Sequence, residues 1–193
     1  MQAMSSRSNQ VRIIAGQWRG RKLAFPDAGG LRPTSDRMRE TLFNWLQPVL
    51  PGASCLDLFA GSGALGFEAA SRGAAKVVML DSARDVVGAL QENAKLLSAS
   101  TVQVCQQDAA SYLAVEPRPF DVVFLDPPFD SPELMLHSLE CLSAPGWLAP
   151  GAWVYVETPS TAAEPVVPPN WSLEKQKKAG QVAYRLYRYS VPG

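Results

Sequence analysis

Long apolar runs are absent from this sequence. The longest spans only residues 152–156, whereas a transmembrane helix needs about 20 apolar residues. The first residues also lack the apolar stretch of a secretory signal, so we expect a cytoplasmic protein with no membrane contact. The three cysteines, Cys55, Cys105 and Cys141, have no CxxC spacing, which argues against disulfides and zinc. His137 is the single histidine, so we expect no metal centre and place this residue on a helix surface.

The charges are balanced in number but segregated along the chain. The sequence has 193 residues, 47% hydrophobic and 19% charged, enough for one packed domain. Residues 1–40 carry eight basic and three acidic side chains, a net charge of +5; residues 171–193 carry five and one, a net of +4. Residues 41–170 carry five basic and fourteen acidic side chains, a net of −9. Basic ends around an acidic body indicate contact with a polyanion, or else only two solvated surface elements.

The amino-terminal part predicts a small hairpin followed by a helix. Two short apolar runs flank residues 16–20, where glycines alternate with basic and aromatic residues, so we expect residues 1–30 to form a basic β-hairpin extension. Residues 26–33 are rich in Pro and Gly and predict a linker. A helix is expected to begin at Ser35 or Asp36, both good N-cap residues, and to end before Pro48.

From there to the end, strands and helices alternate, and residues 31–193 are expected to form the main domain. Helices are predicted at 64–71, 83–97 and 132–142, and strands at 55–59, 77–80, 102–105, 122–125 and 153–156. This alternation predicts an α/β fold with a largely parallel sheet covered on both faces. Runs at 172–176 and 183–189 predict a terminal antiparallel hairpin.

A glycine-rich loop follows the first strand of this region. Gly61, Gly63 and Gly66 match GxGxxG, and Asp81 ends the next strand, as in a dinucleotide site. Asp57, at the end of the first strand, fits such a site poorly because a carboxylate repels a pyrophosphate.

A cofactor that carries an ammonium and a sulfonium meets no such repulsion, and S-adenosylmethionine is such a molecule. Asp57 would then lie near its amino group, Asp81 would bind the ribose and Asp108, which ends the third strand, would meet the adenine amine. The alternative is that these three aspartates only cap turns and helices.

The sequence Asp126-Pro127-Pro128-Phe129 is the most informative motif. It directly follows an apolar strand, so it is expected to face the same crevice as the glycine loop. The Asp126 carboxylate and the Pro127 carbonyl can each accept one hydrogen of an exocyclic amine, while Phe129 stacks on the base. Such a site would catalyse methyl transfer to the amine by orienting it and by stabilising the developing positive charge.

Together these segments resemble the bacterial 16S rRNA (guanine(966)-N(2))-methyltransferase family, which is a family of class I S-adenosylmethionine-dependent methyltransferases. The resemblance rests on the glycine loop, on the Asp126 motif, on residues 12–23 and on residues 31–46, and it runs in order from about residue 11 to 190. It implies a Rossmann-like fold with a seven-stranded, mostly parallel sheet, helices on both faces and the small hairpin extension. It also implies methylation of one guanine N2 in 16S rRNA, within an assembled or partly assembled small ribosomal subunit.

The resemblance carries site residues over to this chain. It places catalysis on Asp126, Pro127, Pro128 and Phe129. It implies that cofactor binding involves Asp57, Phe59, Ala60, Gly61, Ser62, Gly63, Asp81, Ser82, Asp108, Ala109, Thr34 and Arg37. Arg32 and Glu40 are further candidates from the segment that closes over the cofactor in related enzymes, although Arg37 and Glu40 could instead pair along one helix.

RNA contact is expected at the basic hairpin, and the chain is expected to be a monomer. The candidates are Arg12, Trp18, Arg19, Arg21 and Lys22, with Lys175, Lys177 and Lys178 second. Three alternatives stay open. The chain could methylate the amine of another base, because the Asp126 motif serves several; it could be a nicotinamide-dependent oxidoreductase that uses GxGxxG; or it could bind rRNA without catalysis.

Overall fold

The computed structural model describes residues 9–27 and 34–193, and within them the strands form two sheets. The small sheet is the expected amino-terminal hairpin, in which β1 (Asn9–Arg12) pairs antiparallel with β2 (Lys22–Phe25). The large sheet has seven strands in the order β5-β4-β3-β6-β7-β9-β8. These strands are β3 (Ser54–Asp57), β4 (Lys76–Asp81), β5 (Val102–Gln106), β6 (Phe120–Leu125), β7 (Leu148–Pro159), β8 (Trp171–Ala179) and β9 (Val182–Tyr189).

Strands β3 to β7 are parallel, and the predicted terminal hairpin of β8 and β9 continues the sheet antiparallel to β7. The strand order reverses between β3 and β6. These strands are neighbours in the sheet, although their first paired residues, Cys55 and Val122, are 67 positions apart in the sequence. Ligands of open α/β sheets bind beyond the carboxyl ends of the strands at such a reversal. The fold therefore places a binding crevice after Asp57 on one side and after Leu125 on the other.

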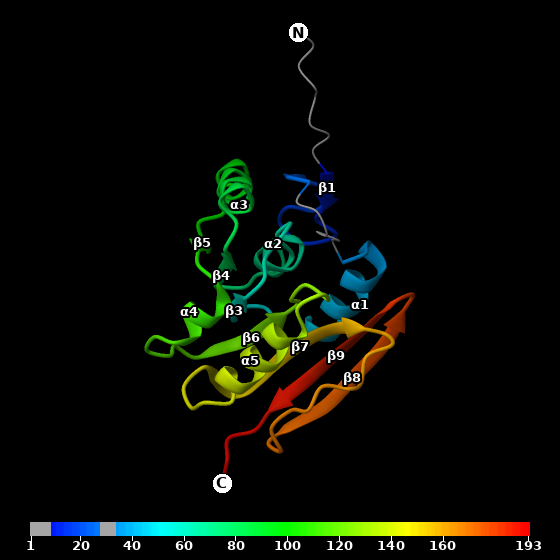
Figure 1. The fold of residues 1–193 in the computed structure, drawn as a ribbon. Helices are drawn as coiled ribbons and strands as arrows, with labels where there is room; N and C mark the ends of the chain where they lie inside the picture. Colours follow the sequence, from blue (N-terminus) through cyan, green and yellow to red (C-terminus); the bar gives the residue numbers. More distant parts are fainter. Residues whose placement is uncertain (1–8, 28–33) are drawn as a thin grey trace.

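Helices cover both faces of the large sheet (Figure 1). The first three are α1 (Asp36–Leu46), α2 (Ala64–Ser71) and α3 (Arg84–Leu96), which pack with the hairpin in one core; α4 (Ala109–Leu113) and α5 (Pro132–Leu142) pack in the second core on the other face. Neighbouring strand residues alternate between these cores, as Phe124 and Leu125 do. The seven-stranded, mostly parallel sheet with helices on both faces, which the family resemblance implied, is confirmed.

Element boundaries follow local signals with small corrections. Ser35 caps α1, because its side chain accepts a hydrogen bond from the Met38 N–H at 3.3 Å. The strand expected at 55–59 ends at Asp57, since the chain turns there into the glycine loop. The short helix α4 was not predicted; it begins at the Asp108 cap. No helix among the described residues is long and apolar enough to span a bilayer.

The amino-terminal hairpin shares the core of the main domain. Val11, Ile13, Leu23 and Phe25 are buried in the same cluster as α1 and α2. Its turn lies against α2, where a Cβ on Gly16 would come within 2.0 Å of the Ser71 carbonyl oxygen. The hairpin is thus held in one orientation relative to the large sheet.

Candidate active site

The glycine loop between β3 and α2 is buried and tied to the end of β4. The Gly61 N–H donates a hydrogen bond to the Asp81 carboxylate at 3.1 Å. Gly63 has a φ of +80°, and a Cβ there would lie 2.6 Å from the Phe67 ring. A Cβ on Gly66 would lie 2.8 Å from the Met79 side chain, so this glycine permits close packing of α2 on β4. The loop backbone consequently passes close to the carboxyl ends of β3 and β4.

Two of the predicted cofactor acids, Asp81 and Asp108, also hold backbone. Asp81 accepts from the Ala83 N–H at 3.0 Å in addition to Gly61. Asp108 accepts from the Ser111 N–H at 2.9 Å and from the Ser111 hydroxyl at 2.7 Å, and these bonds lower the pKa of the Asp108 carboxyl. The capping role considered for these residues is therefore present. Each carboxylate oxygen has two lone pairs, so capping leaves both acids able to accept from a ligand.

Asp57 differs from both because it is buried without a close partner. It is 1% exposed, and neither carboxylate oxygen has a hydrogen-bond partner among the described residues. Burial raises the pKa of Asp57 to about 7, while the nearby N–H groups of Phe59 and Gly66 oppose this shift more weakly. A buried acceptor of this kind is strongly suited to a cationic donor.

The Asp126 motif lies on the other side of the strand reversal from Asp57. Burial raises the pKa of Asp126 well above its usual range, and the nearby acids Glu157 and Asp57 raise it further. Pro127 is buried, and its carbonyl accepts no hydrogen bond from the described residues. Phe129 is 44% exposed and stands open to a partner. The structure thus brings a carboxyl group, an available carbonyl and an exposed aromatic ring to one edge of the sheet.

The other residues predicted to bind the cofactor differ in their exposure to solvent. Phe59 is partly exposed, Ala60 and Ser62 are buried, Ser82 is exposed and Ala109 is buried at the start of α4. The Ser62 hydroxyl accepts from the Ala64 N–H, the first residue of α2, at 3.3 Å.

Of the cofactor-site candidates predicted before and within α1 that the structure describes, only Thr34 is buried near the proposed site. Thr34 is buried, and its hydroxyl donates to the Glu157 carboxylate at 3.3 Å. Arg37 and Glu40 are exposed on α1, and no ion pair joins them among the described residues. Arg32 lies outside the described residues.

Arg39 is the buried cation of α1, which sequence reasoning missed. Its guanidinium is 1% exposed and lies 2.6 Å from Asp36 and 3.4 Å from Glu68. Glu68 also accepts from the Ile14 and Ala15 N–H groups at 2.9 and 3.1 Å. The two charged residues therefore join α1, α2 and the hairpin. Position 39 lies within the predicted helix, but nothing in the sequence identifies its partner, 29 residues away.

Glu157 and Tyr155 are the other site residues that the motif search missed. Glu157 is 6% exposed at the end of β7, and the Tyr155 hydroxyl donates to its carboxylate at 2.9 Å. A signal was present in the sequence: an acid directly follows the longest apolar run, at the carboxyl end of a strand.

The hairpin residues expected to contact RNA divide into buried and exposed. The prediction of an exposed RNA contact at Trp18 is wrong in this structure, because the side chain is 7% exposed and packs in the core. Its backbone N–H donates to the Ser71 hydroxyl at 3.0 Å. Arg12, Arg19, Arg21 and Lys22 are exposed. Among them Arg12 pairs with Asp36 at 3.5 Å, and Arg21 donates to the Leu96 carbonyl at 3.3 Å.

The remaining predicted residues lie on the surface. His137 is exposed on α5, as expected, and Lys175, Lys177 and Lys178 are exposed on β8.

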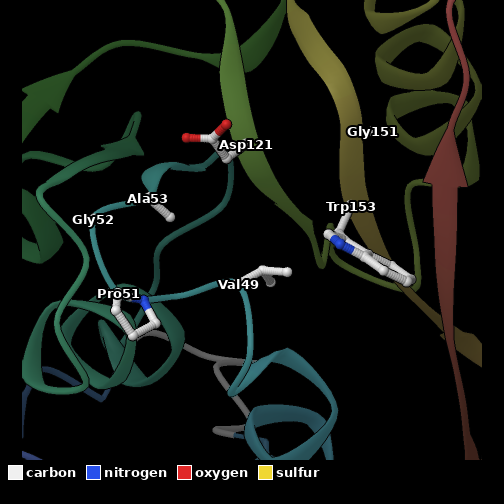
Figure 2. A pocket seen from close by; sticks show the side chains of 7 residues that line it. All are labelled: Val49, Pro51, Gly52, Ala53, Asp121, Gly151 and Trp153. Atoms are coloured by element: carbon white, nitrogen blue, oxygen red, sulfur yellow. The ribbon is translucent and has the colours of Figure 1, made fainter.

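A hollow of about 300 Å³ lies away from the predicted site. Its lining includes Ala53, Asp121 and Trp153 (Figure 2). Ala53 precedes β3 and Asp121 is the second residue of β6, so this hollow lies at the amino ends of the strands, opposite the crevice.

Comparison with known proteins now decides the family. The model of the family described as Conserved hypothetical protein 95 matches residues 11–188. The ribosomal RNA small subunit methyltransferase D of Escherichia coli K12 is 52% identical over 188 residues, which cover 97% of this chain and 94% of the relative. The chain belongs to this family. The family resemblance inferred from the motifs is confirmed.

Solved structures agree with the fold. The structure of the Escherichia coli protein yhhF superimposes with a TM-score of 0.89 at 49% identity, and the match covers 94% of this chain and 99% of that one. The T. thermophilus 16S rRNA N2 G1207 methyltransferase, solved with AdoMet and guanosine, has a TM-score of 0.68 at 22% identity, covering 96% of this chain and 50% of that one. The chain has the class I methyltransferase fold.

Proposed function

We propose that this chain transfers a methyl group from S-adenosylmethionine to the exocyclic N2 of one guanine in 16S rRNA. Its membership of a family with the ribosomal RNA small subunit methyltransferases D gives the reaction class, an rRNA methyltransferase. The observation that carries the site assignment is the placement of Asp57 and Asp126 on the two sides of the strand reversal. We further propose that the chain acts as a cytoplasmic monomer on an assembled or partly assembled small subunit.

The described residues fit S-adenosylmethionine. Asp57 is a buried carboxyl group that lacks a partner, which suits the amino group of the cofactor. The loop from Phe59 to Gly63 would pass along the cofactor, because its glycines permit close approach of the backbone. Asp81 would accept hydrogen bonds from the ribose hydroxyls, and Asp108 would accept one from the adenine amine. Ser82 and Ala109 directly follow these two acids and would lie beside the cofactor. When bound, this cofactor supplies a methyl group activated by a sulfonium.

The Asp126 motif would position the guanine. One amine hydrogen would bond to the Asp126 carboxyl and the other to the Pro127 carbonyl, which directs the nitrogen lone pair away from both. Phe129 would stack on the base, and Pro128 fixes the backbone between them. Holding the nucleophile in this geometry accounts for the rate increase without a covalent intermediate.

A methyl-transfer assay tests the function directly. Labelled S-adenosylmethionine is offered with naked 16S rRNA, or with small subunits from a strain that lacks the endogenous enzyme, and the product nucleoside is identified. We expect N2-methylguanine at one site, and the better acceptor reports the substrate form. N6-methyladenine, or stabilisation by NAD instead of S-adenosylmethionine, would overturn the assignment.

Two matched variants locate the chemistry. Asp126→Ala should abolish turnover while the protein still binds the cofactor. Asp130→Ala removes an exposed carboxylate four residues farther along and should retain turnover. Full activity of Asp126→Ala would refute its catalytic role.

The exposed basic residues of the hairpin are proposed to contact rRNA phosphates. Arg19 and Lys22 form no ion pair with the described residues, so their charges are available. Arg19→Ala and Lys22→Ala should each weaken RNA binding and reduce the slope of log affinity against log salt by about 1. Arg118→Ala, which removes an exposed charge from the loop before β6, serves as the control. An unchanged salt slope in both hairpin variants would exclude this surface.

A further inference from the structure

We infer that Glu157 works as a pair with Asp126: it holds the Asp126 carboxyl group in place and receives, through Asp126, the proton that the guanine amine loses. This inference rests on the proposed function and adds a positioning residue that the Asp126 motif does not contain.

Strand register places the two carboxyl groups next to each other. Strands β6 and β7 are parallel neighbours in which Phe124 pairs with Tyr155 and Leu125 with Val156. The next positions along the two strands are Asp126 and Glu157. Because side chains alternate between faces, both acids lie on the face of Phe124 and Tyr155, under α1. Their carboxyl groups share a hydrogen bond.

The Glu157 carboxylate is fixed on its other side. The Tyr155 hydroxyl and the Thr34 hydroxyl both donate to its Oε2 atom, at 2.9 and 3.3 Å. These two donors leave Glu157 little freedom to rotate, so its hydrogen bond to Asp126 also fixes the Asp126 carboxyl. Thr34 precedes α1, which means that this contact joins segments 123 residues apart.

The surroundings favour one proton shared by the pair. Asp57 on β3 is a third acid near the Asp126–Glu157 pair. The other titratable groups on this side are Tyr155, which is near both acids of the pair, and Tyr184, which is near Tyr155. None of the ion pairs among the described residues reaches these acids; the buried cation Arg39 is held by Asp36 and Glu68. Burial raises the pKa values of both Asp126 and Glu157. Like-charged carboxyl groups in contact lose their protons in two separate steps. As part of the inference, we assign the pair one retained proton and a single negative charge.

This state of the pair can take up one more proton. After methylation the amine nitrogen is positively charged and holds one proton too many. Its N–H bond breaks with the electron pair remaining on nitrogen, and the proton binds Asp126, whose own proton moves to Glu157. The amine thereby becomes neutral, and the pair changes from a net charge of −1 to zero. Release of that proton to water restores the starting state.

Glu157→Gln is the decisive variant, because it is isosteric and keeps acceptors for Tyr155 and Thr34 but cannot take up a proton. We expect kcat to fall about 100-fold, in the range for lost general base catalysis, with KM for the subunit and affinity for S-adenosylmethionine nearly unchanged. The acid limb of the pH profile should also move. Glu157→Asp should recover part of the rate. A purely structural role predicts a normal rate and pH profile for Glu157→Gln once it is folded.

The free protein gives a second readout that needs neither cofactor nor RNA. NMR of labelled aspartate carboxyl carbons, with Asp126 and Asp57 assigned through Asp126→Asn and Asp57→Asn, reports the pKa of each acid. In Glu157→Gln the pKa of Asp126 should fall, because a neighbouring negative charge is removed. An unchanged Asp126 titration would overturn the pair even if methylation occurs. If the wild type methylates no guanine while the titration shifts as expected, the proposed function fails and the pair remains.

Discussion

Arg39 of α1 and Glu68 of α2 form a buried ion pair, with 3.4 Å between guanidinium and carboxylate and both side chains at most 1% exposed. The same carboxylate accepts from two N–H groups of the hairpin and from Arg72 at 2.9 Å. One acid therefore fixes the hairpin, with its exposed basic residues, to α1 and α2 on one face of the large sheet.

Replacement of Glu68 should loosen this junction. Glu68→Ala leaves Arg39 buried without its full set of partners, so we expect the free energy of unfolding to fall by about 3–5 kcal/mol. Urea denaturation measures this loss, and hydrogen exchange at Ile14 and Ala15 should rise. Glu92→Ala, at an exposed position of α3, should change stability little. Equal stability of the two variants would contradict a joining role for Glu68.

Gly63 at the N-cap of α2 and Gly88 inside α3 should respond oppositely to an added methyl group. Gly63→Ala forces a non-glycine residue to a φ of +80° and against Phe67, at an expected loss of about 2–4 kcal/mol and with weaker cofactor binding. Gly88→Ala in α3 adds a Cβ that meets nothing within 4 Å, and should stabilise by about 0.5–1 kcal/mol. Denaturation and calorimetric titration with S-adenosylmethionine compare them. Tight cofactor binding by Gly63→Ala would argue against a close approach of the loop.

Asp57 should link stability to pH. Its pKa is about 7 in the folded protein against an ordinary value of 3.8, so the folded state binds the proton more tightly and stability falls as pH rises between these values. In Asp57→Asn this part of the slope should vanish. At neutral pH the variant should be more stable by about 1–3 kcal/mol, below the ~4 kcal/mol of the full shift, because the amide is also buried without a partner.

Asp57→Asn should have the opposite effect on cofactor binding: it should weaken binding although it stabilises the free protein. Asp57→Asn should bind S-adenosylmethionine at least tenfold more weakly, because the cationic amino group loses its carboxylate. Thermal unfolding with and without cofactor measures both effects in one experiment. A variant that is less stable than the wild type across the whole pH range would show that Asp57 is structural.

Asp108 and Ser111 separate helix capping from ligand binding. Ser111→Ala removes the 2.7 Å hydroxyl bond but keeps the acid, so stability should fall slightly and cofactor affinity should hold. Asp108→Ala removes the whole cap, worth about 1 kcal/mol, and should also weaken binding of the adenine end. Competition with adenosine measures the second effect. Equal cofactor affinity in both variants would leave Asp108 as a cap alone.

The sequence by itself determined the architecture and supplied the main candidate residues of the proposed site. Apolar alternation, helix periodicity and cap residues are local signals, and they predicted the parallel sheet, four of the five helices of the described residues and both terminal hairpins. The glycine loop and the Asp126 motif were equally readable, because each lies in a short contiguous segment at the end of a strand.

Tertiary structure decided what depends on residues far apart in the chain. Trp18 looked like an exposed hairpin tip but is buried, since the hairpin turn packs on α2. Arg37 and Arg39 lie on the same predicted helix, and the packing of α1 against Glu68 buries Arg39 while Arg37 stays exposed. The contact of Glu157 with Asp126 depends on the register of β6 and β7. Burial and register are properties of the assembled sheet, so no local pattern in the sequence contains them.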